Sequence, residues 1–307
     1  MEPETRNLEL RAHVLRMRGV TLIEMIVVMV ITGILAAAVA LFIRHPIEGY
    51  MDAARRAELT DIADTALRRI TRDLRTALPN SIRVTPVGSA FYIEYLEVRT
   101  GGRFRSEVPA VAVPAGPATC PDTDGDTFAN ENVLQFGVAD TCFATIGEIP
   151  DRTAITTTDF LVVFNLGAGM PNADAYASGA VTGGNKSLIT AAVGVGAGGE
   201  NVVQFQSHTF TLASPGKRFQ IVSGPVTYAC VPPELRRYWG YPITQTQATP
   251  PAGGNNALLA SNVTGCSFVY ATGSAGQRTG VVALTLEISQ SGEAVRLFQQ
   301  VHVNNAP

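Results

Sequence analysis

Hydrophobic positions near the start of the chain form one continuous run. From Val20 to Ile43 the only side chains that are neither apolar nor glycine are Thr21, Glu24 and Thr32. At ~1.5 Å per residue, such a run crosses a hydrocarbon layer of ~30 Å as a single helix. The pattern therefore predicts a transmembrane helix over residues 20–45.

A periodic pattern follows the apolar run. Over residues 47–78 apolar side chains recur every three to four positions and charged side chains fill the positions between them. This spacing is typical of an amphipathic helix, and Pro79-Asn80 is a stop signal. We expect residues 46–79 to form the amphipathic half of the first helix. Something downstream must then cover its apolar stripe.

Two residues are weak points within this long helix, Gly33 and Pro46. Proline removes one backbone hydrogen bond, and its ring crowds the carbonyl of the residue four positions earlier, here Phe42. A kink or break is therefore expected near Pro46.

After Asn80 the pattern changes to short runs rich in Val, Phe, Tyr and Thr, separated by Gly, Pro, Asn and Ser. Such runs are typical of strands. The predicted strands are 91–98, 160–164, 202–212, 218–223, 226–230, 266–271, 281–288 and 294–303. Because no helices alternate with them, we expect antiparallel pairing in one sheet or in two small ones. The predicted fold class is α+β, with the long helix packed on the strands of an exported domain at 80–307 that carries a loop-rich insertion around 109–200.

Glu24 is the anomaly inside the apolar run. A charge at the bilayer centre costs ~2.5 to 3.5 kcal/mol, and less near an end, so such a residue suggests a function. The run contains no Lys or Arg to pair with it. Cleavage between Gly19 and Val20 would create an α-amino group four residues before Glu24, and the amino group of a neighbouring copy could reach the carboxylate directly. This interpretation requires a protease, an oligomer and a parallel bundle of helices.

These residues resemble a known family. Arg18-Gly19-Val20-Thr21-Leu22-Ile23-Glu24, followed by the apolar run, resembles the class III leader of type IV pilins and type II secretion pseudopilins, with Val20 where an aromatic residue is usual. Residues 55–70 and 265–270 look more narrowly like the MshO-type minor pilins of the mannose-sensitive haemagglutinin (MSHA) pilus. The resemblance implies that residues 1–19 are removed by a prepilin peptidase, that Val20 is N-methylated, and that the fold is pilin-like.

The same resemblance implies a minor subunit, because the exported domain is larger than that of a typical major pilin. Its expected partners are other pilin subunits, the prepilin peptidase, an inner-membrane assembly platform and, before assembly, membrane lipid. The expected location is the bacterial inner membrane, with a single pass and a periplasmic C-terminal domain, and then the pilus. A minor pseudopilin similar to the J-type subunit of type II secretion is the first alternative.

Two other interpretations of the N-terminal apolar run remain open. One is a single-span anchored enzyme or binding module in the periplasm, which would have no use for Glu24 at that depth. The other is an ordinary signal peptide with its apolar core at 22–35 and small residues at 36–40. Glu24 and the helical pattern beyond Pro46 both speak against a signal peptide.

All four cysteines follow the membrane run. Four cysteines allow three pairings, and the simplest joins nearest neighbours, Cys120 with Cys142 and Cys230 with Cys266, because each bridge then closes a short excursion. No Cys-x-x-Cys spacing occurs and the histidines lie far from the cysteines in sequence, which argues against a zinc cluster. Reduced cysteines in a cytosolic core are the alternative, but disulfides suit an exported domain better.

Asp122, Asp124 and Asp126 alternate in a short acidic stretch. Carboxylates of this kind are the hard oxygen ligands that Ca²⁺ takes. The EF-hand pattern fails, since Thr127 stands where glycine is required and Val133 where the bidentate Glu should be. A calcium loop and a solvated acidic turn are thus both open, and no other cofactor is predicted.

Enzyme-like signals are weak. Residues 194–199 match G-x-G-x-x-G formally, but 201–210 reads as a strand where a nucleotide site needs a helix, so a hairpin loop is predicted. Residues 236–242 form the densest aromatic cluster and suit either an anchor for a neighbouring subunit or a loop against a sheet edge. With no catalytic motif we expect no enzyme, and a net charge of -3 with scattered arginines excludes a nucleic-acid partner.

Overall fold

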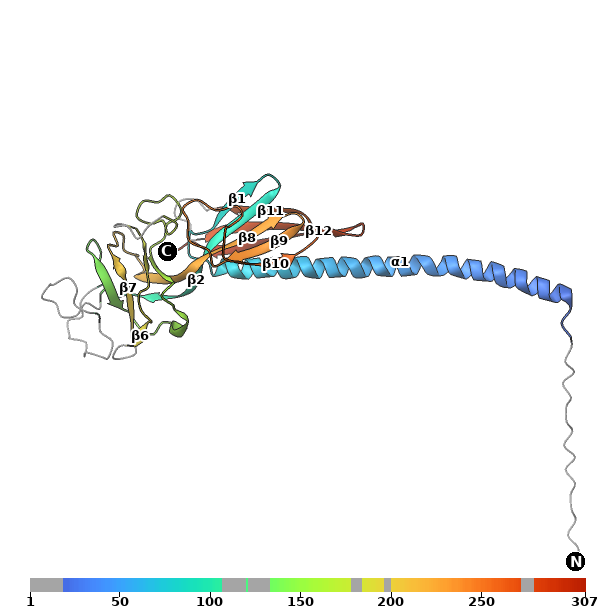
Figure 1. Ribbon diagram of the computed structural model, residues 1–307, viewed down its shortest axis with the longest axis horizontal. Coiled ribbons are helices and arrows are strands. Elements are labelled where there is room, and N and C mark those ends of the chain that lie inside the picture. The colour runs from blue at the N-terminus through green and yellow to red at the C-terminus, as the bar shows by residue number, and fades with distance from the viewer. Residues whose placement is uncertain (1–18, 107–119, 121–132, 178–183, 196–199, 272–278) are drawn as a thin grey trace, which may run out of the picture. The chain divides into compact units, whose positions relative to one another are not determined.

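The computed structural model describes residues 19–106, 120, 133–177, 184–195, 200–271 and 279–307 (Figure 1). The chain divides into two compact units, Met1–Ala54 and Arg55–Pro307. Helix α1 (Leu22–Arg75) contributes to both. Its first part is the described structure of the N-terminal unit, and its last part belongs to the second unit.

Helix α1 runs through Gly33 and Pro46 without interruption. A complete break near Pro46 therefore does not occur, and the kink expected there stays a prediction. One lost hydrogen bond is a local cost, and the long stretches on both sides, rich in Leu, Ala, Ile and Met, propagate the helix cooperatively across it.

The helix ends at Arg75, four residues before the predicted boundary. Its last turn tightens, because the amides of Thr76 and Ala77 donate to the carbonyls three residues earlier at 3.1 and 3.3 Å. Leu78 then leaves the helical path and its amide donates to the carbonyl of Leu96 at 2.9 Å. The side chain of Leu78 is buried, with 1% exposure. Its burial was predicted correctly, but its helical backbone conformation was not.

The rest of the described chain is almost entirely strand and loop. The elements are β1 (Arg83–Val87), β2 (Ala90–Arg103), β3 (Asp140–Ala144), the 3-10 helix η1 (Arg152–Ala154), β4 (Phe160–Val163), β5 (Lys186–Leu188), β6 (Gly194–Val195), β7 (Asn201–His208), β8 (Arg218–Val231), β9 (Glu234–Trp239), β10 (Asn255–Ala260), β11 (Val263–Ala271), β12 (Thr279–Gln290) and β13 (Glu293–Asn304). Every pairing between these strands is antiparallel. The predicted α+β class is confirmed, and the architecture is consistent with a pilin-like fold.

The described strands form three sheets rather than one or two. The largest is seven-stranded, with the order β1-β2-β8-β4-β5 and with β9 and β10 added through β8. The others are three-stranded, β11-β12-β13 and β3-β7-β6. The predicted strands 218–223 and 226–230 are one strand, β8, and the region 109–200 contains β3, β5 and β6, which were not predicted. These strands are only two to five residues long, too short for a sequence period to reveal them.

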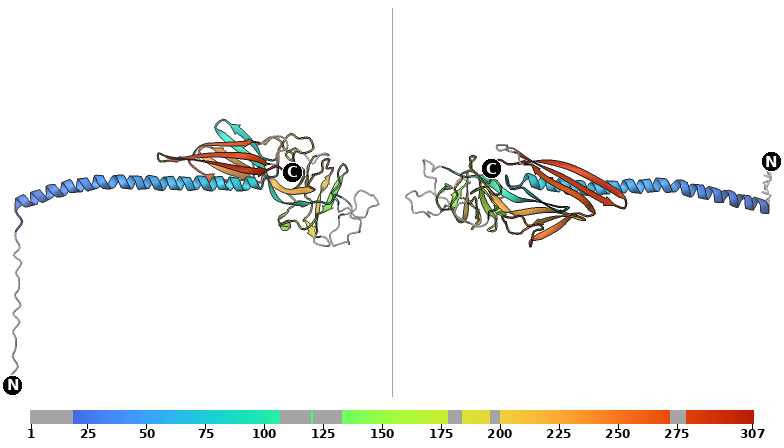
Figure 2. Two further views of the ribbon diagram at one scale, coloured as in Figure 1. Left: turned by 180° about the vertical axis from the view of Figure 1, so that it is seen from behind. Right: turned by 90° about the horizontal axis from the view of Figure 1, so that it is seen from above.

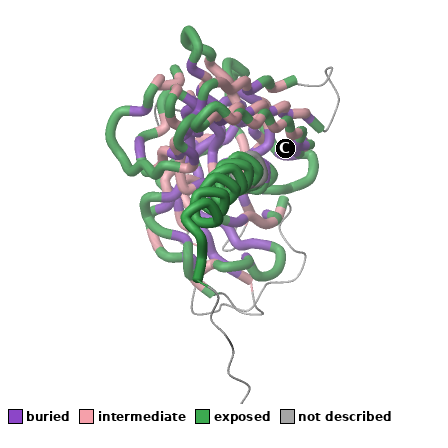
Figure 3. The backbone as a smooth tube through the Cα atoms, turned by 90° about the vertical axis from the view of Figure 1, so that its right-hand side faces the viewer, coloured by how far each residue is buried: buried purple, intermediate pink, exposed green. Residues whose placement is uncertain are grey.

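The last part of α1 packs on two of the sheets. Its apolar stripe shares one core with residues of β2, β8 and β9 and with the β11-β12-β13 sheet, which lies beside the helix in Figure 2. In Figure 3 the turns of α1 nearest the viewer are exposed, and buried residues gather among the strands of the second unit. The helix residues in this core are Leu59, Ala63, Ala66, Leu67, Ile70 and Leu74.

A second core lies at the other end of the long strands β2 and β8. Their pairing shifts register between Glu97 and Thr100, and beyond this point β8 contributes Phe219 and Ile221 to a core shared with β3 and β7, which Phe104 joins directly after β2. Aromatic rings dominate there, with Phe143 against Phe219 at 5.0 Å between centroids. The two long strands therefore join both cores into one domain.

Candidate processing and assembly site

Helix α1 begins with a side-chain cap. Thr21 lies just outside the helix, and its hydroxyl Oγ1 accepts the amide of Glu24 at 3.3 Å while its carbonyl accepts the amide of Met25 at 3.1 Å. Threonine followed three residues later by glutamate is the spacing of a capping box. The sequence thus dictates where the helix starts.

The predicted cleavage site lies just before this cap. Gly19 and Val20 are outside the helix and exposed, and nothing lies within 4 Å of a Cβ built on Gly19. A protease must bind its substrate in an extended conformation, and the peptide bond between Gly19 and Val20 is free of the helical hydrogen bonds that would resist this. The geometry suits proteolysis at the predicted position.

Glu24 occupies the first helical turn, with its side chain exposed. A carboxylate at this end of a helix is favoured by the partial positive charge of the free amides, typically by ~0.3 to 1 kcal/mol. That is less than the cost of placing a charge in the bilayer interior, ~2.5 to 3.5 kcal/mol at its centre. Among the described residues no cation pairs with Glu24. The helix itself therefore compensates only part of the cost.

Residues Leu22–Phe42 are long and apolar enough to cross a membrane, with a mean hydropathy of 2.8. None of this stretch is buried within the structure. Its mid-span hydroxyl is satisfied locally, because Thr32 Oγ1 donates to the carbonyl of Val28 at 2.6 Å. The stretch thus presents side chains that suit lipid or other apolar helices on all sides.

The far end of α1 is held by a charge network that the sequence did not reveal. Tyr228 donates its hydroxyl to the carboxylate of Asp73 at 2.5 Å, and Arg237 lies 3.3 Å from the same carboxylate and donates to Glu97 at 2.9 Å. Burial, and then the hydrogen bond to Asp73, raise the pKa of Tyr228. Asp73 was expected on the outer, solvated face, but its side chain is only 13% exposed.

A second buried ion pair crosslinks the large sheet. Glu94 is 1% exposed and accepts from Arg83 at 2.9 Å and from the hydroxyls of Thr227 and Tyr241, each at 3.1 Å. Burial raises the pKa of Glu94, and Arg83 opposes that rise. The signal in the sequence was a carboxylate between apolar and aromatic residues over 91–96.

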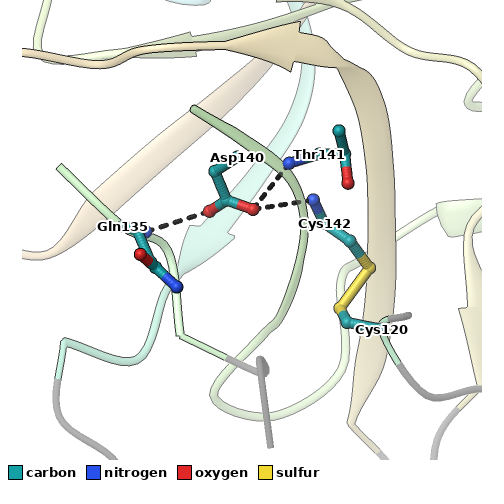
Figure 4. The surroundings of a disulfide bond; sticks show 5 residues. All are labelled: Cys120, Gln135, Asp140, Thr141 and Cys142. Carbon is teal, nitrogen blue, oxygen red and sulfur yellow. Dashed lines mark hydrogen bonds between the residues drawn. A yellow bond between two sulfur atoms is a disulfide. The ribbon is translucent and has the colours of Figure 1, made fainter. Parts of the chain in front are cut away.

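Both predicted disulfides are present. Cys230–Cys266 joins β8 to β11 and so ties two sheets of the first core, with a Cα–Cα distance of 6.5 Å. Cys120–Cys142 ties residue 120 to β3, with a Cα–Cα distance of 5.4 Å. Asp140 organises the start of β3, accepting the amides of Gln135, Thr141 and Cys142 at 3.0, 2.6 and 3.0 Å (Figure 4).

Replacing Cys230 and Cys266 together by alanine is expected to destabilise the β-rich domain by about 3 to 4 kcal/mol, because the bridge closes a long loop in the unfolded chain. The two cysteines are separated by 36 residues. Thermal unfolding of the purified protein in detergent measures this as a lower Tm. An unchanged Tm would show that the bridge contributes nothing to stability.

The sequence offered three other candidate features. Asp122, Asp124 and Asp126 lie outside the described residues, and no cluster of three or more potential metal ligands occurs among those that are described. Residues 194–195 form β6, which pairs with β7 as an antiparallel hairpin. The aromatic cluster at 236–242 was expected to be a loop against a sheet edge or an anchor for a neighbouring subunit. Its residues up to Trp239 belong to strand β9, which is paired on both sides, so the loop is wrong for them and the anchor stays a prediction.

A surface cavity of about 520 Å³ lies beside β5 and β8. Lys186 lines it, but its ammonium donates to the carbonyls of Ala175 and Ala177 at 2.8 and 2.6 Å. Burial lowers the pKa of Lys186 to about 8. The hydroxyl of Ser223 in the same cavity is bonded to Glu97 at 3.0 Å. The polar groups of this cavity are thus engaged with the protein itself and do not converge on a common point.

The fold and the N-terminal segment together define a membrane-anchored, pilin-like protein. Residues 15–40 match the family model described as the prokaryotic N-terminal methylation motif. This match supports a type IV pilin-like or pseudopilin-like protein that is processed by a prepilin peptidase and assembles with other pilin subunits. No curated protein and no solved structure matches the chain.

Proposed function

We propose that the protein is a minor pilin, a structural subunit of a type IV pilus of the MSHA type that is inserted in the bacterial inner membrane with its C-terminal domain in the periplasm. Cleavage after Gly19 releases the leader, and methylation of Val20 follows. The observation that carries the proposal is the juxtaposition at the start of α1: an exposed, non-helical Gly19–Val20 bond directly before a capped apolar helix with Glu24 in its first turn.

In this proposal function is assembly rather than catalysis. Helices from Val20 onward bundle with those of neighbouring subunits, and Glu24 pairs with the α-amino group of an adjacent one. The exported domain, with its helix end held by the Asp73 network, then caps or joins neighbours. We propose no enzymatic activity and no resident cofactor, with a calcium ion at the acidic stretch 122–126 as a separate hypothesis.

A minor pseudopilin of a type II secretion system is the second candidate. The same cleavage site and the same ion pair of Glu24 are expected in a pseudopilin. The two candidates therefore differ only in the assembly that the subunit joins, a pilus or a secretion system. Co-purification of this chain with pilus subunits or with secretion components distinguishes them.

The intact mass of the mature protein tests processing. We expect the membrane form from cells with a prepilin peptidase to begin at Val20 and to carry one added methyl group. Cells that lack the peptidase should contain the chain with residues 1–19 attached. A mature form that keeps the leader, or that begins near Ala40, would overturn the proposal.

A further inference from the structure

Strand β13 forms one edge of the β11-β12-β13 sheet. It pairs with β12 over its whole length without any shift of register. On the other side of β12, the amide of Ser289 donates to the carbonyl of Asn262 at 3.0 Å. Backbone groups alternate between the two sides of a strand, so the odd-numbered residues of β12 bond towards β11 and its even-numbered residues bond towards β13.

This register identifies the backbone groups of β13 that point away from the sheet. Its odd-numbered residues lie opposite the even-numbered residues of β12 and bond to them, so its even-numbered residues direct N–H and C=O outwards. Within the part of the chain that the structure describes, these outward groups have no hydrogen-bond partner from Ala294 to His302. Strand β13 therefore presents a row of donors and acceptors that repeats every ~6.8 Å.

The other edge strands of the described sheets are short, interrupted or tied to a neighbour, as is usual in native proteins. Strands β1 and β3 have five residues, β5 has three and β6 has two, while the pairing of β10 shifts register and a disulfide ties β11 to β8. By contrast, β13 has 12 residues and contains no Pro, Gly or Lys. The hairpin of β12 and β13, coloured red, extends beyond the other strands in both views of Figure 2.

The apolar core is incomplete along β13. Leu286 and Ile288 of β12 are 0% exposed, but the residues opposite them in β13, Leu297 and Val295, are only partly buried. On the outer face of the sheet Phe298 is 63% exposed. A further strand beside β13 would cover apolar side chains on both faces as well as pair the outward backbone groups.

We propose that β13 accepts a strand from a different subunit of the same fibre, which extends the three-stranded sheet by one strand. An extended chain supplies alternating donors and acceptors at the required spacing, whereas a helix uses its own backbone groups internally and a lipid tail has none. This inference deepens the proposed function and rests on it. It names a contact made by the β-rich domain, separate from the contacts of α1.

Side chains on the outer face of β13 specify the chemistry of the added strand. Arg296 is exposed and has no ion pair among the described residues, so a carboxylate opposite it is favoured. Phe298, two positions further on, favours a β-branched or aromatic neighbour. The outer face of β13 carries no acidic residue of its own. A second copy of β13 therefore does not supply the carboxylate, and the partner is a different strand.

Photocrosslinking at Phe298 tests the pairing. We replace Phe298 with the photoreactive analogue p-benzoylphenylalanine in cells that process and assemble the full chain, and measure adducts on immunoblots. In that background Gln300→Pro removes an outward N–H that the chain itself does not use and places a ring at the edge. It should reduce the adduct with another subunit about tenfold. The matched control Gln300→Ala keeps the N–H and should stay within about twofold of the parent.

Peptide mapping of the adduct identifies the partner segment. We expect a strand in which Asp or Glu lies two positions from an apolar residue, and Arg296→Glu should reduce the adduct about threefold. Hydrogen exchange of the unmutated chain gives a measurement that does not depend on how the proline variant folds. The amides of Arg296, Phe298 and Gln300 should exchange freely in the purified processed protein and at least about tenfold more slowly in fibres.

Three results would overturn the inference: adducts only with a second copy of this chain or with lipid, equal adducts for Gln300→Pro and Gln300→Ala, or outward amides that exchange as fast in fibres as in the purified protein. If no adduct forms while cleavage after Gly19 and entry into fibres are normal, only this inference fails. If the parent chain is not cleaved or does not enter fibres, the proposed function fails with it.

Discussion

Replacing Glu24 with alanine is expected to leave cleavage after Gly19 intact and to abolish incorporation of the protein into fibres. Removing one partner of a desolvated ion pair costs ~3 to 5 kcal/mol, which is roughly a hundredfold or more in the equilibrium for incorporation. Cleavage should survive because the exposed Gly19–Val20 bond precedes the helix and the side chain of Glu24. Intact mass measures the cut, and immunoblots of sheared fibres and of membranes measure incorporation.

The capping geometry allows the charge of Glu24 to be tested apart from its role in the helix. Glu24→Gln keeps a side chain that can complete the capping box but removes the charge, so it should behave like Glu24→Ala. Thr21→Ala removes the hydroxyl that accepts the amide of Glu24, at a cost of ~0.5 to 2 kcal/mol, and keeps the carboxylate. It should still be incorporated. Normal incorporation of Glu24→Gln together with failure of Thr21→Ala would refute the ion pair and leave helix capping as the role of this segment.

Replacing Arg83 with methionine is expected to destabilise the β-rich domain by ~3 to 5 kcal/mol, because it leaves a buried carboxylate without its cation. Arg83 is the only cation that contacts Glu94 among the described residues, and it also donates to the carbonyls of Thr244 and Gln245 at 3.0 and 2.7 Å. For a domain of this size the loss corresponds to a fall in Tm of roughly 10 °C. Thermal unfolding of the processed protein in detergent measures it.

The deficit of Arg83→Met should grow with pH. Burial already raises the pKa of Glu94 above its ordinary value of 4.5, and losing Arg83 removes an influence that lowers it. A carboxyl whose pKa is higher in the folded state stabilises the fold most below its unfolded pKa and loses that contribution as pH rises through the folded pKa. The Tm difference from the parent should therefore be smallest near pH 4.5 and largest at neutral pH.

Neutralising the acid as well provides the matched control. The variant with both Arg83→Met and Glu94→Gln has no charge to bury, so its stability deficit should lose this pH dependence and be smaller at neutral pH. A deficit for Arg83→Met that is constant between pH 4.5 and 7.5 would show that packing of the arginine against the ring of Tyr176, 3.7 Å away, matters more than the ion pair.

Short-range patterns carried most of what the sequence could predict. The apolar run and the amphipathic stripe depend on spacings of one to four residues, which the helix itself imposes. The long strands β2, β8, β12 and β13 were recognisable because enough apolar residues lie together in each. Both disulfides followed from the order of four cysteines in the chain.

Only the tertiary structure decided those elements that depend on hydrogen bonds between residues far apart in sequence. The short strands β3, β5 and β9 adopt the strand conformation because they pair with longer neighbours. Segments of so few residues show no recognisable alternation of apolar and polar side chains. Helix α1 ends at Arg75 rather than beyond Leu78 because the amide of Leu78 donates a hydrogen bond to the carbonyl of Leu96 in β2.

By itself the sequence determined an apolar stretch long enough to cross a membrane as one helix, and it predicted where a protease cuts. These properties are local, since they depend only on neighbouring residues and on the thickness of a bilayer. Only the tertiary structure decided that Asp73 and Glu94 are buried. The cation of Glu94 lies 11 residues away, and Asp73 contacts Arg237, far along the chain, in addition to the nearby Arg69 and Arg72.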